Sequence, residues 1–307
     1  MLQYISVQPC TLYYSWQVDV MLSNFIDVGI HQSDIHILLA YETEIDIKTY
    51  YVWNKLIEKY KNVNFYFYKD KRINKNYVSS VRPNVLMQFY EDNKKFTNLP
   101  VFYHDCDILF TKTVEFSDLL EDNVWYLSDT NSYINSEYIK SKCHGIYEKM
   151  CDIVSIDPSI PEKFNQNSGG AQYIIKNVDS EFWKRVELDS ENLFTKITEY
   201  NIELKNRYSN YHEIQIWCAD MWALLWNAWK SGHITQVVKD MDFCWATDNI
   251  SKWDQCPIYH NAGVSNEYKN LFNKFDYISK IPYNIDLSKI DKNYCNYKYV
   301  EQINSIK

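Results

Sequence analysis

Two carboxylates spaced one residue apart, Asp105 and Asp107, are the residues whose type and spacing point most directly to chemistry. They lie within Val101–Phe110, where short apolar runs flank them, and such aromatic and branched runs are typical of a buried strand. Because alternate side chains of a strand point the same way, we expect both carboxylates to face one side and Cys106 the other. Like charges so placed repel each other unless a cation lies between them. Oxygen ligands suit Mg²⁺ or Mn²⁺, so the spacing predicts a metal site that binds a diphosphate.

The same pair has a simpler interpretation, in which a strand ends in a turn that carries two solvated aspartates. An isolated Asp-x-Asp is short enough to occur by chance. A late histidine, His260, favours the metal site, because neutral imidazole is a common ligand of Mn²⁺-type ions. The preceding Pro257–Tyr259 reads as a short strand that would deliver His260, and Gly263 would let the chain turn over a diphosphate. The alternative for His260 is a hydrogen-bonded loop histidine.

Glycine is scarce, with six in the chain, yet Gly169 and Gly170 are adjacent. They precede a strand predicted at Tyr173–Lys176. A loop of this kind could let a sugar pack on bare backbone, because glycine has no Cβ. The alternative is an ordinary tight turn.

A carboxylate among aromatic residues is the last candidate. Asp220 lies in a helix predicted over Tyr211–Lys230, which also carries several tryptophans that we expect to pack in the core. An acidic side chain in apolar surroundings requires a partner or a function. The alternative to a functional role is a structural contact with a lysine, an arginine or a backbone N–H group.

Alternating strands and helices must position these residues. Strands are predicted at Leu2–Gln8, Ile35–Tyr41, Val63–Tyr68 and Asn123–Ser128. Helices are predicted at Tyr14–Val28, Ile47–Tyr60, from Ser79 or Ser80 onward, at Ile146–Val154 and at Asp179–Ile197; the rest of Asp129–Pro161 reads as irregular. This alternation predicts right-handed βαβ units and a mostly parallel sheet, which binds ligands beyond the carboxyl ends of its strands.

Composition sets further limits. The chain has 307 residues, 46% hydrophobic and 23% charged, as expected for a globular protein of one large or two small domains. It has no apolar run long enough to span a membrane and no recognisable signal peptide. Eight cysteines without a Cys-x-x-Cys predict reduced thiols and a cytoplasmic location. The net charge of −8 argues against a broad duplex-DNA-binding face.

Together these features resemble a GT-A glycosyltransferase. The resemblance covers roughly Leu2–Tyr283. It rests on the alternating elements of the N-terminal half, the Asp105-Cys106-Asp107 strand, Gly169-Gly170, Asp220, and His260-Asn261-Ala262-Gly263. More narrowly the chain is similar to viral and bacterial transferases of unassigned acceptor, and distantly to hydroxyproline arabinosyltransferases and peptidyl-serine galactosyltransferases.

The fold that this resemblance implies is α/β, a GT-A-like (Rossmann-like) mixed, mostly parallel central sheet flanked by helices. The implied organisation is a single catalytic domain, 1–285, and a C-terminal tail, 286–307.

The resemblance implies a metal-dependent transfer of a sugar from a nucleotide-diphosphate sugar to an acceptor hydroxyl. Asp105 and Asp107 would hold Mn²⁺ or Mg²⁺, and His260 would complete the metal site. The metal would bind both phosphates of the donor, for which we expect a UDP-sugar. A Lewis acid of this kind stabilises the charge that develops on the leaving diphosphate.

The resemblance also implies roles for residues outside the metal site. Arg82 and Lys274 would assist the leaving diphosphate. In the first strand-to-helix loop, Tyr13 or Tyr14 would stack on the nucleotide base. The donor sugar or the acceptor would be lined by Ser168, Gly169 and Gly170. Asp220 would bind sugar hydroxyls or act as the catalytic base, a role for which Glu213 is a second candidate.

The sequence departs from the glycogenin-like pattern His-x-x-Gly-x-x-Lys-Pro-Trp. His260 and Gly263 match its spacing, but no Lys-Pro-Trp follows. This departure leaves open whether Lys274 contacts the diphosphate, and whether transfer retains or inverts the anomeric configuration.

Two alternatives remain beside the transferase. One is a non-catalytic protein of the same fold that binds carbohydrate or nucleotide-sugar. The other is a sugar nucleotidyltransferase, although those enzymes usually carry a glycine-rich signature with arginine and lysine after the first strand, and Gln8–Tyr13 has neither. The sequence leaves open the acceptor, which could be a glycan, a protein or a modified nucleobase, and the oligomeric state.

Overall fold

The computed structural model describes residues 1–265 and 267–306, and the chain divides into two compact units. Unit 1 comprises Lys69–Phe102 and Leu119–Val238, together with Met1. Unit 2 comprises Leu2–Tyr68, Tyr103–Asp118 and the chain from Lys239 onward. Both units are therefore built from segments that are distant in the sequence.

The strands form a seven-stranded and a three-stranded sheet, ordered β3-β2-β1-β4-β7-β6-β8 and β5-β10-β9. The larger sheet contains β1 (Gln3–Pro9), β2 (Ile35–Tyr41), β3 (Asn64–Lys69), β4 (Val101–His104), β6 (Trp125–Asp129), β7 (Gly169–Ile175) and β8 (Thr235–Val237). Strands β1 and β2 pair in parallel, as do β6 and β8, whereas β6 and β7 are antiparallel. This mixed, mostly parallel sheet confirms the predicted α/β class.

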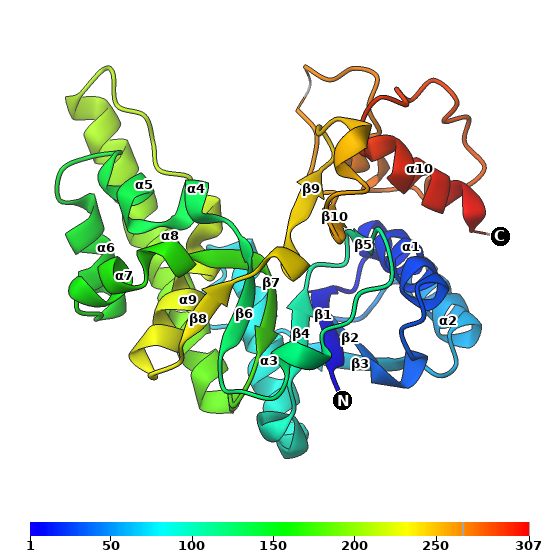
Figure 1. The fold of residues 1–307 in the computed structure, drawn as a ribbon, viewed down its shortest axis with the longest axis horizontal. Helices are drawn as coiled ribbons and strands as arrows, with labels where there is room; N and C mark the ends of the chain where they lie inside the picture. The colour runs from blue at the N-terminus through cyan, green and yellow to red at the C-terminus, as the bar shows by residue number, and fades with distance from the viewer. Residues whose placement is uncertain (266, 307) are drawn as a thin grey trace. The chain divides into compact units, whose positions relative to one another are not determined.

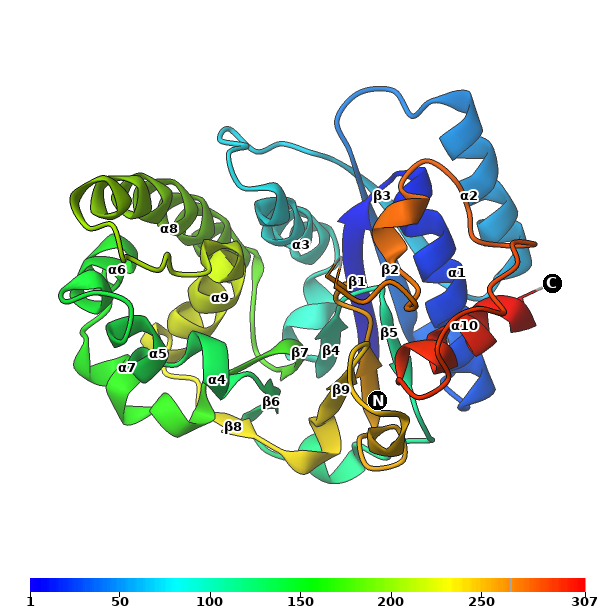
Figure 2. The same ribbon diagram turned by 90° about the horizontal axis from the view of Figure 1, so that it is seen from above.

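Unit 2 begins with alternating strands and helices. Helices α1 (Leu12–Asp27) and α2 (Ile47–Lys59) lie side by side near β1, β2 and β3 (Figures 1 and 2). Asp46 caps α2, since its side chain accepts hydrogen bonds from the backbone N–H groups of Lys48 and Thr49, both at 3.0 Å. Gly29 follows α1 with φ +95°, a conformation that suits glycine after a helix.

The rest of unit 2 surrounds the smaller sheet, which consists of β5 (Ile108–Phe110), β9 (Phe243–Trp245) and β10 (Ile258–His260). Helix α10 (Asn296–Ser305) lies beside α1 (Figure 2). A buried cluster that includes Trp16, Tyr259 and Tyr299 joins the two helices to this sheet. The segment predicted as a C-terminal tail therefore contributes a helix to the core of unit 2.

Unit 1 is mainly helical around β6, β7 and β8. Helix α8 (Ser180–Arg207) packs against α3 (Val81–Asp92), α6 (Ile146–Val154) and α9 (Ala219–Lys230), as Figure 1 shows for α8 and α9. Asp179 caps α8, because its carboxylate accepts a hydrogen bond from the Phe182 backbone N–H at 2.8 Å.

The predicted single strand over Val101–Phe110 is wrong. Strand β4 ends at His104, Asp105–Asp107 form a turn, and the chain resumes as β5 in the other sheet. The alternation argument for the two carboxylates therefore fails, because a turn intervenes. The apolar pattern of the sequence does not reveal this change of sheet, because β4 and β5 are both fully buried.

The predicted helix over Tyr211–Lys230 is also too long. Helix α9 begins at Ala219, after a 3₁₀ turn at Ile216–Cys218. The residues before it bond to α8 instead of forming a helix of their own. The Tyr211 hydroxyl donates to the Asn201 side chain at 2.8 Å, and the Asn201 amide donates to the Ile214 carbonyl at 3.3 Å.

Two other segments differ from prediction. Helix α8 runs ten residues beyond the predicted Ile197, to Arg207. The stretch predicted as mostly irregular contains three short helices besides α6, namely α4 (Asn131–Ile134), α5 (Ser136–Lys140) and α7 (Ser159–Lys163). Short 3₁₀ helices lie at Gln32–Asp34, Val78–Ser80, Lys94–Asn98, Ser117–Leu119, Asn165–Asn167, Ile216–Cys218, Lys239–Met241, Ile250–Lys252 and Lys274–Tyr277.

Gly169 and Gly170 lie inside β7 and not in a loop before it. A Cβ on Gly169 would stand 2.4 Å from the Leu127 Cβ and 2.7 Å from the Ser128 carbonyl oxygen. A Cβ on Gly170 would stand 2.5 Å from the Met221 Cε. Close packing against β6 and α9 thus explains both glycines.

Neither α8, the longest helix, nor any other helix within the described residues combines the length and apolarity needed to cross a membrane.

Candidate metal-binding site

The turn between β4 and β5 places Asp105 and Asp107 at the carboxyl end of β4, in unit 2. Asp107 is buried, and its backbone carbonyl accepts a hydrogen bond from the Asn261 N–H at 2.9 Å. Asp105 is more open, with 24% of its side chain exposed. The backbone contact fastens the aspartate turn to the chain that leaves β10.

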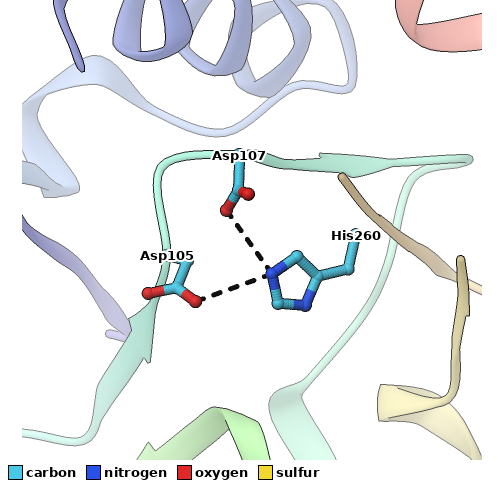
Figure 3. Close-up of side chains that lie close together, drawn as sticks. All are labelled: Asp105, Asp107 and His260. Atoms are coloured by element: carbon cyan, nitrogen blue, oxygen red, sulfur yellow. Dashed lines mark ion pairs between the residues drawn. The ribbon is translucent and has the colours of Figure 1, made fainter. Parts of the chain in front are cut away.

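His260 reaches both carboxylates from the end of β10. This strand pairs antiparallel with β5, with His260 opposite Ile108, the residue that follows Asp107. The Nε2 atom of His260 lies 3.5 Å from Asp105 Oδ2 and 3.4 Å from Asp107 Oδ1, as Figure 3 shows. The predicted strand before His260 is confirmed, although His260 belongs to the strand itself and not to a loop.

Two aromatic residues of β9 hold the His260 ring in place. Strand β9 pairs in parallel with β10, with Trp245 opposite His260. The rings of Trp245 and His260 stack with centroids 5.6 Å apart and planes 21° apart, and the Phe243 ring lies 5.9 Å from the imidazole. Packing of this kind limits rotation of a ligand side chain.

Lys274 supplies a positive charge to the same turn. Its Nζ donates to Asp107 Oδ2 at 2.5 Å, and both side chains are about nine-tenths buried. Burial raises the pKa of the Asp107 carboxyl, but the charge of Lys274 and the contacts with His260 and Lys274 outweigh burial. The pKa of Asp107 is therefore held well below its ordinary value, and the group is a carboxylate at neutral pH.

Asp105, Asp107 and His260 can each direct one ligand atom to a common point, since these atoms all lie within 4.8 Å of one another. Among residues 1–265 and 267–306, no other group of at least three histidine, cysteine or acidic side chains meets this criterion. Two carboxylates and one imidazole form a donor set that suits Mn²⁺, and the carboxylates also suit Mg²⁺. The residues present therefore fit a divalent metal.

The predicted base-stacking residues also lie in unit 2, in the first turn of α1. The Tyr13 ring stacks on Phe275, with centroids 6.3 Å apart and planes 13° apart, and meets Tyr14 edge to face at 4.9 Å. Burial raises the pKa of Tyr13 well above its ordinary value, with a further contribution from the charge of Asp107. Tyr13 therefore lies in the field of the metal site; base stacking by Tyr13 or Tyr14 stays a prediction.

The remaining candidates lie in unit 1, where the structure brings Arg82 and Asp220 together. Arg82 Nη1 donates to Asp220 Oδ2 at 3.4 Å, and the Tyr77 hydroxyl donates to Asp220 Oδ1 at 2.6 Å. Burial and the charge of Asp220 raise the pKa of Tyr77 well above its ordinary value, so this hydroxyl keeps its proton. Asp220 thus has the arginine partner that the structural alternative required, and its catalytic role stays a prediction.

Ser168 and Glu213 have local contacts within unit 1. Ser168 is buried, and its carbonyl accepts a hydrogen bond from the Thr130 hydroxyl at 3.4 Å. Glu213 is exposed and pairs with Lys205 at 2.9 Å. Their predicted roles, like those of Gly169 and Gly170, stay predictions.

Sequence reasoning missed two residues that support these groups, Trp245 beside His260 and Tyr77 beside Asp220. Phe243-Cys244-Trp245 has the aromatic character of a short strand, and that signal could have identified β9. The register that places Trp245 beside His260 depends on pairing between strands that the sequence does not specify. Tyr77 precedes a predicted helix, and nothing in the sequence around it indicates its contact with Asp220.

No protein-family model matches the sequence, and no curated protein matches it. Solved structures do. The WbbM bifunctional glycosyltransferase matches 99% of this chain with a TM-score of 0.51 and 10% identity; this chain spans 50% of the WbbM chain. The galactosyltransferase LgtC, solved with donor and acceptor sugar analogues, matches over 100% of this chain and 96% of its own, with a TM-score of 0.45 and 12% identity.

A third match is a glycosyltransferase involved in glycosylation of the major capsid of PBCV-1. It covers 86% of this chain and 94% of its own, with a TM-score of 0.41 and 10% identity. At such identities the likeness concerns the fold, and the match to WbbM supports it. Together with the strand order and the position of Asp105 and Asp107 after β4, this match shows that the chain has the fold of a GT-A glycosyltransferase.

Proposed function

We propose that this protein is a metal-dependent glycosyltransferase that moves a sugar from a nucleotide-diphosphate sugar to an acceptor hydroxyl. One observation carries the proposal: Asp105, Asp107 and His260 converge beside Lys274 on a fold of the GT-A type. Mn²⁺ or Mg²⁺ is the proposed cofactor and a UDP-sugar the proposed donor. A cytoplasmic location is part of the proposal, in keeping with eight cysteines that are all free thiols.

The residues of unit 2 would bind the metal and the leaving diphosphate. Asp105, Asp107 and His260 hold the metal, and Trp245 keeps the imidazole plane fixed. The metal, when bound, supplies Lewis-acid stabilisation of the leaving diphosphate. Lys274 offers an ammonium group within the same site, where it keeps Asp107 ionised and can bind a phosphate oxygen.

In unit 1, Asp220 is the proposed group that accepts hydrogen bonds from sugar hydroxyls or removes the acceptor proton. Tyr77 and Arg82 orient its carboxylate through the contacts at 2.6 and 3.4 Å. An inverting transfer requires a base that is held in a fixed position near the acceptor hydroxyl.

The test is release of UDP from a panel of UDP-sugars, with water as acceptor, at increasing Mn²⁺ concentrations. We expect Asp107→Ala to lose about 10²-fold or more in turnover while the fold survives, because a charge-stabilising group is removed. Asp254→Ala, at an exposed aspartate of the same unit, is the control and should behave as the wild type.

Wild-type turnover in Asp107→Ala would refute the metal site. Binding of UDP-sugar with Mn²⁺ but without any turnover would favour a non-catalytic binding protein. Release of pyrophosphate from a nucleoside triphosphate in the presence of a sugar phosphate would favour a nucleotidyltransferase.

A further inference from the structure

Trp217 is the one exposed tryptophan among the ten of this chain, all of which lie within the described residues. Its exposure is 55%, whereas Trp222 and Trp226 in the following helix have exposures of 0% and 1%. An indole exposed to water does not gain the favourable free energy that burial of apolar surface gives the neighbouring tryptophans. An exposed tryptophan next to a candidate catalytic carboxylate therefore requires an explanation.

A second aromatic ring accompanies it. Tyr133 of α4 lies with its ring centroid 6.0 Å from that of Trp217, and the two planes are 31° apart. Tyr133 is half-buried, whereas Trp217 is exposed. We name this pair, Trp217 and Tyr133, the aromatic platform.

The backbone on both sides of the aromatic platform is fixed. The Tyr77 hydroxyl donates to the Trp217 carbonyl at 2.6 Å, and the next residue, Cys218, is fully buried. The indole N–H of Trp222 donates at 2.8 Å to the carbonyl of Ile134, which follows Tyr133. The backbone that carries the two rings is therefore held in place, which lowers the entropic cost of binding a ligand.

A carboxylate lies close to the backbone of Trp217. The same Tyr77 hydroxyl contacts both the Trp217 carbonyl and Asp220 Oδ1, each at 2.6 Å. The Asp220 side chain keeps 17% of its surface exposed. A carboxylate has about four acceptor positions, so Asp220 can accept hydroxyl donors in addition to Tyr77 and Arg82.

We propose that the aromatic platform and Asp220 bind a glycan, which under the proposed function is the acceptor. The C–H face of a pyranose ring is apolar and packs on an aromatic face, while its hydroxyl groups donate to a carboxylate. Nucleobases also stack on aromatic rings, but in a nucleic acid they bring phosphates, which a carboxylate and a chain of net charge −8 repel. The combination of open aromatic rings with a carboxylate selects a neutral polyol.

The experiment uses the full chain in EDTA, so that metal and donor play no part. Methyl glycosides of galactose, glucose, mannose, xylose and N-acetylglucosamine are titrated, and binding is followed by saturation-transfer NMR and by tryptophan fluorescence. We expect at least one glycoside to bind and to shift the emission of Trp217, because stacking removes water from the exposed indole. Trp217→Ala should weaken binding about tenfold or more, and Trp217→Phe should retain most of it.

Tyr133→Ala should also weaken binding, whereas Tyr208→Ala, at a tyrosine of unit 1 that is 54% exposed, should leave it unchanged. Circular dichroism on each variant verifies the fold. The proposal is overturned if no glycoside binds, if Trp217→Ala binds as the wild type does, or if the nucleoside 5-hydroxymethyl-2′-deoxycytidine binds in place of the glycosides. Because this assay needs neither Mn²⁺ nor UDP-sugar, its failure is distinct from a failure of UDP release.

Discussion

Lys274 and Asp107 form a buried ion pair in which the ammonium occupies Oδ2 of a carboxylate that is also predicted to bind a metal. The lysine and a divalent cation therefore compete for the charge of one side chain. Removing Lys274 leaves that charge uncompensated in a buried position, which makes the site a stronger attractor of cations and the apo protein less stable.

We predict that Lys274→Met binds Mn²⁺ about tenfold more tightly than the wild type in the absence of nucleotide, a difference of about 1.4 kcal/mol. The apo variant should lose about 3 kcal/mol of unfolding free energy relative to the apo wild type. Mn²⁺ should raise the unfolding free energy of the variant by more than it raises that of the wild type. Calorimetric titration and Mn²⁺-dependent melting measure both quantities. Lys269→Met, at an exposed lysine, is the control; equal Mn²⁺ affinities of Lys274→Met and wild type would contradict the competition.

The second prediction concerns Trp245, which stacks on His260, the proposed metal-binding histidine. Trp245→Leu removes the ring that restricts the imidazole, so we expect the Mn²⁺ dissociation constant to rise about tenfold, as for other residues that orient metal ligands. Trp253→Leu replaces another half-buried tryptophan of unit 2, which packs on Tyr259 and not on His260. It should alter thermal stability while the Mn²⁺ affinity of the folded protein stays unchanged. A Trp245→Leu protein with wild-type affinity would show that the stacking has no part in metal binding.

The third prediction uses the two glycines of β7. A methyl group on Gly169 meets backbone and the base of the Leu127 side chain, whereas one on Gly170 meets the ends of two side chains, Met221 at 2.5 Å and Tyr173 at 2.8 Å. Gly169→Ala should therefore destabilise the protein by about 3 kcal/mol or more, and Gly170→Ala by clearly less, because the ends of side chains can shift more easily than backbone. Urea denaturation of both variants gives the comparison. An equal loss at both positions would count against close packing as the reason for Gly169.

The fourth prediction concerns Asp70, which Arg72 holds with hydrogen bonds at 2.8 and 3.0 Å in unit 1. Burial raises the pKa of Asp70, but the hydrogen bonds and charge of Arg72, with Lys75, outweigh it and lower the pKa. Since the folded pKa lies below the unfolded one, this stabilisation is present above the unfolded value of about 3.9 and disappears as pH falls through the folded value.

Asp70→Asn should therefore cost about 3 kcal/mol at pH 7, because the buried Arg72 loses the charge of its nearest acidic partner, and less near pH 3. Chemical denaturation at the two pH values measures the difference. The exposed Asp152→Asn provides the comparison variant. A cost for Asp70→Asn that does not depend on pH would exclude a charged Asp70 as its origin.

Periodicity alone predicted much of the fold. The pattern at Ile35–Tyr41 gave a strand with the observed bounds, and that at Ile146–Val154 gave a helix with the observed bounds. Local apolar patterns report burial, and burial depends on neighbours that the pattern does not identify. For this reason Val101–Phe110 read as one strand, although its halves lie in different sheets.

In the candidate site too, the sequence predicted the residues but not their arrangement. Residue chemistry identified Asp105, Asp107 and His260, and the structure brings all three together. The predicted geometry of the aspartates on one strand face was wrong, because their convergence comes from a turn and from the pairing of β10 with β5. Such pairing joins segments that are distant in the chain, and its register is fixed by tertiary packing and not by local sequence.

The discontinuous make-up of unit 2 has a consequence for the order in which the protein matures. The aspartate turn leaves the ribosome long before β9, β10, Lys274 and α10, all of which belong to the last segment of the unit. Contacts of such high sequence separation form late in folding, because closing the long intervening loop costs entropy first. A nascent chain that stops before Lys239 therefore carries both aspartates but neither the histidine nor the lysine of the site. The three candidate metal ligands can therefore come together only after synthesis has passed His260.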